Sequence, residues 1–170
     1  MFKCGDKVFY GIHGICEIVD VEIKKIDKKN VEYFVLQPFG QTGVKFYVPI
    51  HNELALSKLR PILTANEINE LLIEETKETD SWIADEGQRK LRYKQLISGG
   101  DRAALLRMIH ALYRQRQRQQ SLGRKLHLCD ENFLRDAEKL LSVEFSVVLN
   151  IRQDEVAAYV QKALTQKSDP

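Results

Sequence analysis

The first sixty residues alternate between apolar and polar positions in short runs, which is the pattern of β-strands. In the longest run, Ile15, Val19, Val21 and Ile23 fall on one face and Ile18 is one position out of phase. Such a break predicts a β-bulge. Turn-forming sequences separate the runs, and we expect four or five strands near residues 7–10, 15–23, 31–36, 44–49 and 58–62. Short strands with tight turns predict a strongly bent antiparallel sheet or small barrel that closes its own edges.

After Ile62 the apolar residues recur every three or four positions, as in amphipathic helices. Thr64 and Glu67 fit a capping box, in which each side chain satisfies a free backbone donor at the helix start. The pair Gly99-Gly100 suits a left-handed helix end, and Leu122-Gly123 predicts another break. Five helices are expected to start after Thr64, at Asp80 or Ser81, at Asp101, at Asp130 and after Asp154.

The same spacing predicts which side chains of the helices face inward. The predicted core residues are Ile68, Leu71, Leu72, Leu105, Leu106, Ile109, Leu112, Tyr113, Phe133, Leu134, Ala137, Leu140, Leu141, Phe145, Val156, Ala157, Val160 and Leu164. The second helix is expected to carry Trp82. The fold prediction is therefore α+β with two segregated domains. A small antiparallel β-barrel is expected over residues 1–63, and a bundle of about five helices over residues 64–170.

Length and composition set the broad class of the protein. A chain of 170 residues allows one ordinary domain or two small ones, and 44% hydrophobic residues suffice for a packed core. No apolar stretch has the length of a membrane span, and the N-terminus lacks the apolar core of a signal peptide. The three cysteines, Cys4, Cys16 and Cys129, form no CxxC motif, which is typical of a reducing compartment. We expect a cytoplasmic protein with no membrane partner.

Positive charge is concentrated in one segment, although the formal net charge is only +2. Eleven Lys and Arg residues between positions 89 and 125 accompany a single acid, Asp101, whereas residues 61–88 hold eight acids and one lysine. Like charges on one helix cost stability, so a chain that needed only solubility would interleave acids. The segregation favours a polyanionic partner. The alternative is an Arg-rich helix face that only keeps the protein in solution.

The spacing of the cations places several of them on shared helix faces, where they can contact phosphates. The expected phosphate-binding residues are Arg89, Lys90, Arg92, Lys94, Arg114, Arg118, Arg124 and Lys125. If about five of them touch phosphates, the log–log slope of affinity against salt is about −4 to −5. Such binding is largely independent of sequence. Trp82, the only tryptophan, stands near the seam between the acidic and basic blocks. It can stack on a base or wedge a base step, or it can pack in the core.

The sequence shows little sign of catalytic residues. The sequence holds no phosphate loop, no GxGxxG motif and no nucleophile elbow. The adjacent Glu74 and Glu75 point apart on a helix. Metal-ligand spacing is absent from the four histidines, His13, His51, His110 and His127. We expect no enzymatic activity, no metal, no cofactor and no small-molecule substrate.

The N-terminal residues carry a recognisable motif. Residues 2–16 closely resemble the F-x-x-G-D-x-V-x-Y-x-x-H-G start of the CarD/CdnL family of bacterial transcription regulators. The similarity continues in order through residues 33–36, 47–49, 82, 98–101 and 130–149, so it covers nearly the whole chain. The N-terminal module is shared with the transcription-repair coupling factor. The small size and helical second half of this chain fit the regulators better than that large ATPase.

This resemblance implies a Tudor-like barrel that binds the β subunit of RNA polymerase, by strand-to-strand contact. It also implies a helical domain that contacts promoter DNA at the upstream edge of the transcription bubble. There Trp82 would wedge into the minor groove while basic residues hold the backbone, which stabilises the open complex. We expect a monomer. The polymerase-binding residues that the resemblance implies are Lys24, Lys45, Tyr47, Val48 and Pro49.

The chain also departs from the family pattern. Lys24 and Tyr47 stand where well-known members have arginine; lysine keeps the charge without the planar fork, and tyrosine loses the charge. Asp85 and Glu86 follow Trp82 and place acids close to the expected DNA surface. Two alternatives stay open. One is a general nucleic-acid-associated protein with no polymerase partner, and the other is a protein–protein adaptor whose basic helices bind an acidic partner.

Overall fold

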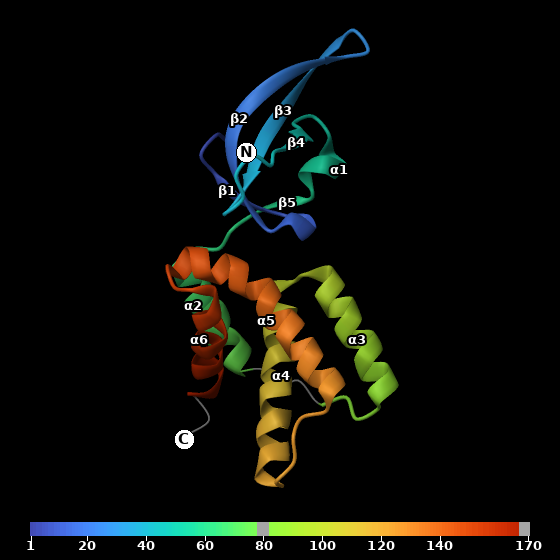
Figure 1. Cartoon of the computed structure of the whole chain (residues 1–170), viewed down its shortest axis with the longest axis vertical. Helices are drawn as coiled ribbons and strands as arrows, with labels where there is room; N and C mark the ends of the chain where they lie inside the picture. The colour runs from blue at the N-terminus through green and yellow to red at the C-terminus, as the bar shows by residue number, and fades with distance from the viewer. Residues whose placement is uncertain (78–81, 167–170) are drawn as a thin grey trace. The chain divides into compact units, whose positions relative to one another are not determined.

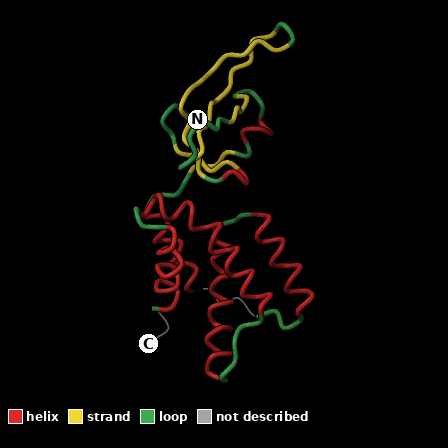
Figure 2. Tube along the Cα trace, in the orientation of Figure 1, coloured by secondary structure: helices red, strands yellow, loops and turns green. Residues whose placement is uncertain are grey.

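The computed structural model describes residues 1–77 and 82–166 of the chain, which divides into two compact units, Met1–Leu63 and Thr64–Pro170. The first unit contains the described strands and the second contains five helices (Figures 1 and 2). This arrangement confirms the predicted α+β class, with an antiparallel sheet followed by a helical region.

The N-terminal unit is built on a five-stranded antiparallel sheet with the strand order β4-β3-β2-β1-β5. The strands are β1 (Lys7–Tyr10), β2 (Ile15–Ile26), β3 (Lys29–Pro38), β4 (Phe46–Pro49) and β5 (Leu59–Pro61). A short helix α1 (Glu53–Leu56) connects β4 to β5. In this described sheet β4 and β5 are the two edge strands, and each is hydrogen-bonded on one side, β4 to β3 and β5 to β1.

The predicted bulge in β2 is confirmed. The pairing of β2 with β3 shifts register between Ile18 and Asp20, so Ile18 can point into the core although it breaks the alternation. The two strands extend further toward their turn than the apolar pattern predicts. They do so because backbone pairing continues through the polar residues around the tip. Asp27 and Lys28 form the turn with φ of 50° and 66°, as a two-residue hairpin loop with positive φ at both positions requires.

Apolar side chains from all five strands meet in one core within the N-terminal unit. The core consists of Val8, Cys16, Ile18, Phe34, Leu36, Val48 and Leu59. Each buried aliphatic or aromatic side chain contributes about 1.5–3 kcal/mol relative to its exposed state. The motif residues at the N-terminus contribute to this fold directly: the rings of His13, Tyr10 and Phe46 pack against one another, with His13 5.1 Å from Tyr10 and 4.2 Å from Phe46 between centroids. Gly14, with φ of 75° and ψ of −149°, turns the chain into β2 in a conformation suited to glycine.

The second unit contains five described helices, as predicted. They are α2 (Ala65–Lys77), α3 (Glu86–Gly99), α4 (Arg102–Ser121), α5 (Leu128–Leu149) and α6 (Gln153–Thr165). Helix α4 contacts α2, α3, α5 and α6, so it lies at the centre of the bundle (Figure 1). Its residues Leu106, Ile109 and Leu112 are fully buried. None of the described helices is long and apolar enough to cross a lipid bilayer.

Helix ends follow the predicted signals at three places. The Thr64 N–H donates to Glu67 Oε2 at 2.7 Å and the Glu67 N–H donates to Thr64 Oγ1 at 3.2 Å, which completes the capping box. Gly100 ends α3 in the left-handed conformation, with φ of 62°. Asp101 caps α4 by accepting a hydrogen bond from the Ala104 N–H at 2.8 Å.

Three predicted helix starts are wrong, and one of them is α6, which begins at Gln153 with Arg152 as its cap and not after Asp154. Helix α3 begins at Glu86 with Asp85 as its cap, so Trp82 precedes the helix; the predicted caps Asp80 and Ser81 lie outside the described residues. Helix α5 begins at Leu128, two residues before Asp130, because that carboxylate is buried in an ion pair and does not cap.

The predicted inward faces hold for most of the helical residues. Leu140 is an exception, with 36% of its surface exposed, and Leu71, Phe133 and Ala157 are half-buried. The outer rows of each helix face therefore remain at the surface, because a helix buries only the middle of its apolar stripe against its neighbours.

Candidate functional site

Strand β4 presents an open backbone edge in the N-terminal unit. The Ile50 N–H donates to the Glu32 carbonyl of β3 at 2.9 Å, just past the end of the strand. In an antiparallel pair the inward-bonded residues alternate, so Phe46 and Val48 bond toward β3. The backbone N–H and C=O of Tyr47 then point away from the sheet. An edge of this kind can accept an extended segment of another protein as a further strand.

The side chain of Tyr47 lies over a small cluster on the outer face of the same strands. Lys24 Nζ lies 3.2 Å from the centroid of the Tyr47 ring, and the Tyr33 ring meets Tyr47 edge-on at 6.4 Å. Tyr47 is 37% exposed. The residues come from β2, β3 and β4, so the face beside the open edge combines aromatic surface with a positive charge.

The other predicted polymerase-binding residues occupy different environments. Lys45 is exposed immediately before β4. Pro49 is half-buried opposite Tyr33. Val48 is only 1% exposed and belongs to the core, so its side chain anchors the strand from inside. Of the five predicted residues, Lys45 and Tyr47 are therefore exposed, Lys24 and Pro49 are half-buried, and Val48 is buried.

In the helical unit, Trp82 lies half-buried in the segment before α3, beside the guanidinium of Arg89. The Arg89 Cζ lies 4.5 Å from the centroid of the Trp82 ring. This distance is that of a cation–π contact. Trp82 is thus neither a core residue nor a fully exposed one.

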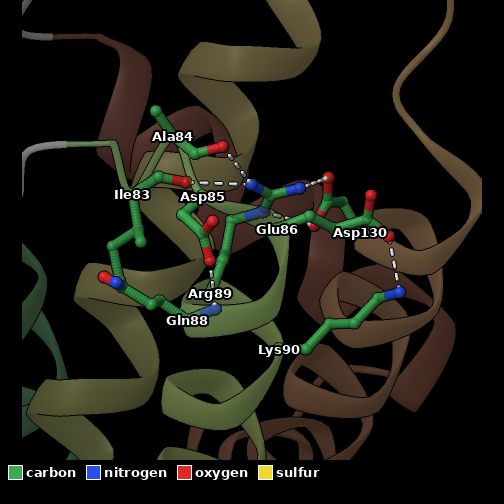
Figure 3. A network of polar contacts seen from close by, with 8 residues as sticks. All are labelled: Ile83, Ala84, Asp85, Glu86, Gln88, Arg89, Lys90 and Asp130. Atoms are coloured by element: carbon green, nitrogen blue, oxygen red, sulfur yellow. Dashed lines mark hydrogen bonds and ion pairs between the residues drawn. The ribbon is translucent and has the colours of Figure 1, made fainter.

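Arg89 itself is buried and fully engaged (Figure 3). Its Nε and one terminal nitrogen donate to the two carboxylate oxygens of Asp130, at 2.9 and 3.0 Å. The other terminal nitrogen donates to the carbonyls of Ile83, at 2.9 Å, and Ala84, at 3.4 Å. The hydrogen bonds to Asp130 raise the pKa of Arg89 above its ordinary value. The guanidinium donors of Arg89 are therefore engaged by groups of the protein itself, whereas the sequence led us to expect a contact with a DNA phosphate.

Lys90 has a partner too, but at the surface. Its Nζ lies 2.5 Å from Glu86 Oε1 one helical turn earlier (Figure 3). The hydrogen bond and charge of each group lower the pKa of Glu86 and raise the pKa of Lys90. Exposed pairs of this kind contribute little to stability. Lys90 can therefore leave Glu86 for another anion at small cost.

Two further cations of the basic segment form ion pairs with carboxylates on other helices. Arg102 forms a two-pronged pair with Glu144 of α5, both distances being 2.6 Å, and Arg107 donates to Glu75 of α2 at 3.2 Å. Seven of the eleven cations have no carboxylate partner among the residues that the structure describes. These are Arg92, Lys94, Arg114, Arg116, Arg118, Arg124 and Lys125. The basic segment thus retains a strong positive field after its internal pairing.

Part of this charge lines a hollow between α3 and α4. The hollow has a volume of about 230 Å³, and its walls include Ile83, Arg92, Arg107 and Ala111. On α4, positions 107, 111, 114 and 118 follow one another at spacings of four, three and four, which places them in one stripe. Arg114 and Arg118 therefore continue the wall of the hollow along α4. Ile83, the residue after Trp82, also lines this hollow, so the backbone that carries the tryptophan borders it.

Arg124 and Lys125 lie apart from that stripe, exposed in the loop between α4 and α5. Lys125 lines a second hollow of about 650 Å³ together with Arg116 and Arg135. Arg135 lies beyond the basic segment and was not predicted, since only the fold brings it beside Arg116. Asp130 was likewise missed as a partner of Arg89, because no local pattern signals an ion pair across 41 residues. Among the described residues, no group of His, Cys, Asp and Glu side chains is arranged to hold a metal ion.

Comparison with known families identifies the N-terminal unit. Residues 2–62 match the model of the CarD-like/TRCF RID domain. The N-terminal unit is a CarD-like/TRCF RID domain. This RNA-polymerase-interacting domain extends from the residue after Met1 to the end of β5, and so contains the open β4 edge and the Lys24–Tyr47 pair.

The RID domain indicates the general function of the chain. It indicates a transcription regulator that has RNA polymerase as its partner. The helical unit lies outside the matched residues, so its role rests on its own side chains. No curated protein sequence matches the chain.

Proposed function

We propose that this chain is a non-enzymatic transcription regulator that ties RNA polymerase to promoter DNA and stabilises the open complex. The observation that carries the proposal is a RID domain joined to a helical unit in which Trp82 accompanies seven cations that have no carboxylate partner among the described residues. The chain would act as a monomer, in the cytoplasm, where polymerase works. Its two units would bind different partners at the same time.

The RID domain would bind the polymerase β subunit by strand addition at β4. The outward backbone groups of Tyr47 supply hydrogen bonds, and main-chain pairing of this kind gives affinity with little dependence on side chains. Specificity would come from the adjoining side chains of Lys24, Lys45 and Tyr47. A lysine over an aromatic ring can contact an acidic or carbonyl-rich surface, although it lacks the planar fork of arginine.

The helical unit would bind DNA near the upstream edge of the transcription bubble. Trp82 would enter a base step there, because an unpaired junction is the place where unstacking costs least. Arg92 in the wall of the hollow and Arg114 and Arg118 in the α4 stripe would hold the phosphate backbone, and Lys90, Lys94, Arg124 and Lys125 would add further charge. If about five of these cations contact phosphates, the salt slope is about −4 to −5.

Weak DNA binding suffices for such a regulator. Once the RID domain is bound to polymerase, the helical unit searches for DNA at an effective concentration in the millimolar range for a short linkage. The regulator shifts the equilibrium between closed and open complexes because it binds the open form better. Each 1.4 kcal/mol of that difference changes the ratio about tenfold.

Two measurements test the proposal. Purified β subunit should retain the full chain in a pull-down, and Tyr47→Thr should reduce the retention. The lifetime of the open complex on a promoter should increase with the wild-type chain and increase less with Trp82→Ala. An absence of retention would reject the polymerase partner. Equal lifetimes with wild type and Trp82→Ala would reject the wedge role of the tryptophan.

A further inference from the structure

Trp82 is half-buried, and the buried side chain of Arg89 supports it. The segment from Trp82 to Asp85 leads into α3 outside regular secondary structure, and its carbonyls at Ile83 and Ala84 both accept hydrogen bonds from one nitrogen of Arg89 (Figure 3). The same guanidinium lies 4.5 Å from the centroid of the indole. Arg89 thus contacts both the ring of Trp82 and the backbone that carries it.

Asp130 fixes the orientation of that guanidinium from another helix. The two carboxylate oxygens accept from Nε and a terminal nitrogen, and this two-pronged geometry sets the plane of the fork. The side chains are only 7% and 3% exposed, so water competes weakly for either partner. Three anchors on the guanidinium, namely the carboxylate of α5 and two carbonyls before α3, leave its plane little freedom.

The geometry points to Arg89 and Asp130 as positioning residues that hold Trp82 ready to enter DNA. Arg89 orients the indole through the cation–π contact and by donating to the Ile83 and Ala84 carbonyls, and Asp130 orients Arg89. This inference rests on the proposed DNA role of Trp82. It also gives Arg89 a task different from phosphate binding, for which its buried fork is badly placed.

We call the arrangement of Arg89 and Asp130 around Trp82 the lock. Preorganisation of the tryptophan explains why this lock would matter. A tryptophan that is free to rotate must be ordered when it enters a base step, and ordering one side chain lowers affinity by about three- to tenfold. Only arginine fits this position, because lysine has a single donor group and no planar surface to stack on the ring. Lysine at position 89 would keep the charge and lose the orientation.

The only tryptophan of the chain provides a direct readout in the free protein. In Arg89→Lys and in Asp130→Asn, we expect acrylamide to quench Trp82 fluorescence about twofold or more faster, with the helix content unchanged by circular dichroism. Glu144→Gln is the matched control, because it breaks a comparable buried pair with Arg102 in the same unit away from Trp82. Its quenching should equal that of the wild type.

A second pair of substitutions covers the case in which the single variants do not fold. Replacing both residues, as Arg89→Met with Asp130→Leu, removes the lock without leaving a lone buried charge, which is the change that a buried pair tolerates best. Faster quenching in this double variant supports the lock. Wild-type quenching in every folded variant of the pair overturns it, whatever the protein does with DNA.

The DNA experiment separates the lock from the proposed function. The probe is a duplex ending in an unpaired fork, titrated with the full-length chain. Arg89→Lys should weaken binding about three- to tenfold, and it should have no effect in a Trp82→Ala background. An equal loss in both backgrounds would show that Arg89 acts through its own charge, and would overturn the lock. If Trp82→Ala alone binds the fork like the wild type, the wedge role fails, and the quenching results still decide whether Arg89 and Asp130 position the ring.

Discussion

Lys24 Nζ lies over the face of the Tyr47 ring, 3.2 Å from its centroid. The two residues belong to β2 and β4, and β3 runs between them with Tyr33 at the edge of the Tyr47 ring. The contact therefore ties the open edge strand to the long β2–β3 hairpin. It also gives each of these two predicted polymerase-binding residues a partner within the RID domain.

The Lys24–Tyr47 contact should be measurable as a coupling energy. A double-mutant cycle of Lys24→Gln and Tyr47→Leu should give about 0.5–1 kcal/mol in the free energy of unfolding, the range for a cation–π pair at an exposed site. Urea denaturation of the four proteins provides the values. Lys25→Gln replaces Lys24→Gln in the control cycle, because adjacent strand residues point to opposite faces. Equal coupling in both cycles would reject the contact.

The backbone of β4 should matter more to polymerase than the ring it carries. Tyr47→Thr removes the ring but keeps the outward N–H and a residue suited to strands, and it should weaken binding of the β subunit several-fold. Tyr47→Pro also removes that N–H, and should weaken binding at least about tenfold, because one buried donor is lost from the pairing. Proline is tolerated in an edge strand, and thermal unfolding verifies the fold of both variants. Equal losses would point to side-chain docking without strand addition.

Much of the fold follows from the sequence because its signals are local. Alternation, the phase break at Ile18, the capping box at Thr64 and the glycine at position 100 each depend on residues within one turn or one strand. One failure has a cause that lies far along the chain. Asp130 has the residue type of a cap, but its carboxylate pairs with Arg89 from a distant helix, and sequence spacing cannot report that pairing.

The candidate site was predicted less completely, for a related reason. A list of cations in the chain does not say which of them have an acid beside them in space. Glu75 and Glu144 lie far along the chain from Arg107 and Arg102, yet the bundle brings each pair together. The sequence therefore locates the charged segment and Trp82. Only the packing of the helices decides which cations of the segment have a carboxylate partner.

That division predicts a difference between two cations on the same helix. Arg92→Gln removes a cation that lines the α3–α4 hollow without a carboxylate partner among the described residues, and should reduce the magnitude of the log–log salt slope of DNA binding by about 1. Lys90→Gln makes the same change in net charge but also frees Glu86, whose hydrogen bond to Lys90 lowers the pKa of that carboxyl. Its slope should therefore change by less than 1 while affinity falls through repulsion. Titrations of a duplex at several salt concentrations distinguish the two, and identical slopes would reject the ranking.

The capping box at the start of α2 should make stability depend on pH. Hydrogen bonds from the backbone and the hydroxyl of Thr64 lower the pKa of Glu67 below its ordinary value of 4.5. A carboxyl with a lowered pKa in the folded state contributes stability above the unfolded pKa, and that contribution is lost as the pH falls through the folded value. Glu67→Gln should flatten the dependence of unfolding free energy on pH below about 4.5. Glu70→Gln, an exposed change on the same helix, is the matched control in denaturant titrations between pH 7 and 3.

The thiol of Cys16 should report the opening of the RID domain, as Trp82 reports the helical unit. Burial in the core raises the pKa of Cys16 to about 11, from an ordinary value of 9.0. Two units of pKa reduce the thiolate fraction about 100-fold near pH 8, and burial also excludes the reagent. In a Cys129→Ser background, Cys4, which is exposed, should react with an aromatic disulfide at least about 100-fold faster than Cys16. In denaturant the two rates should converge, and similar rates in the native protein would show that the core around Cys16 is open.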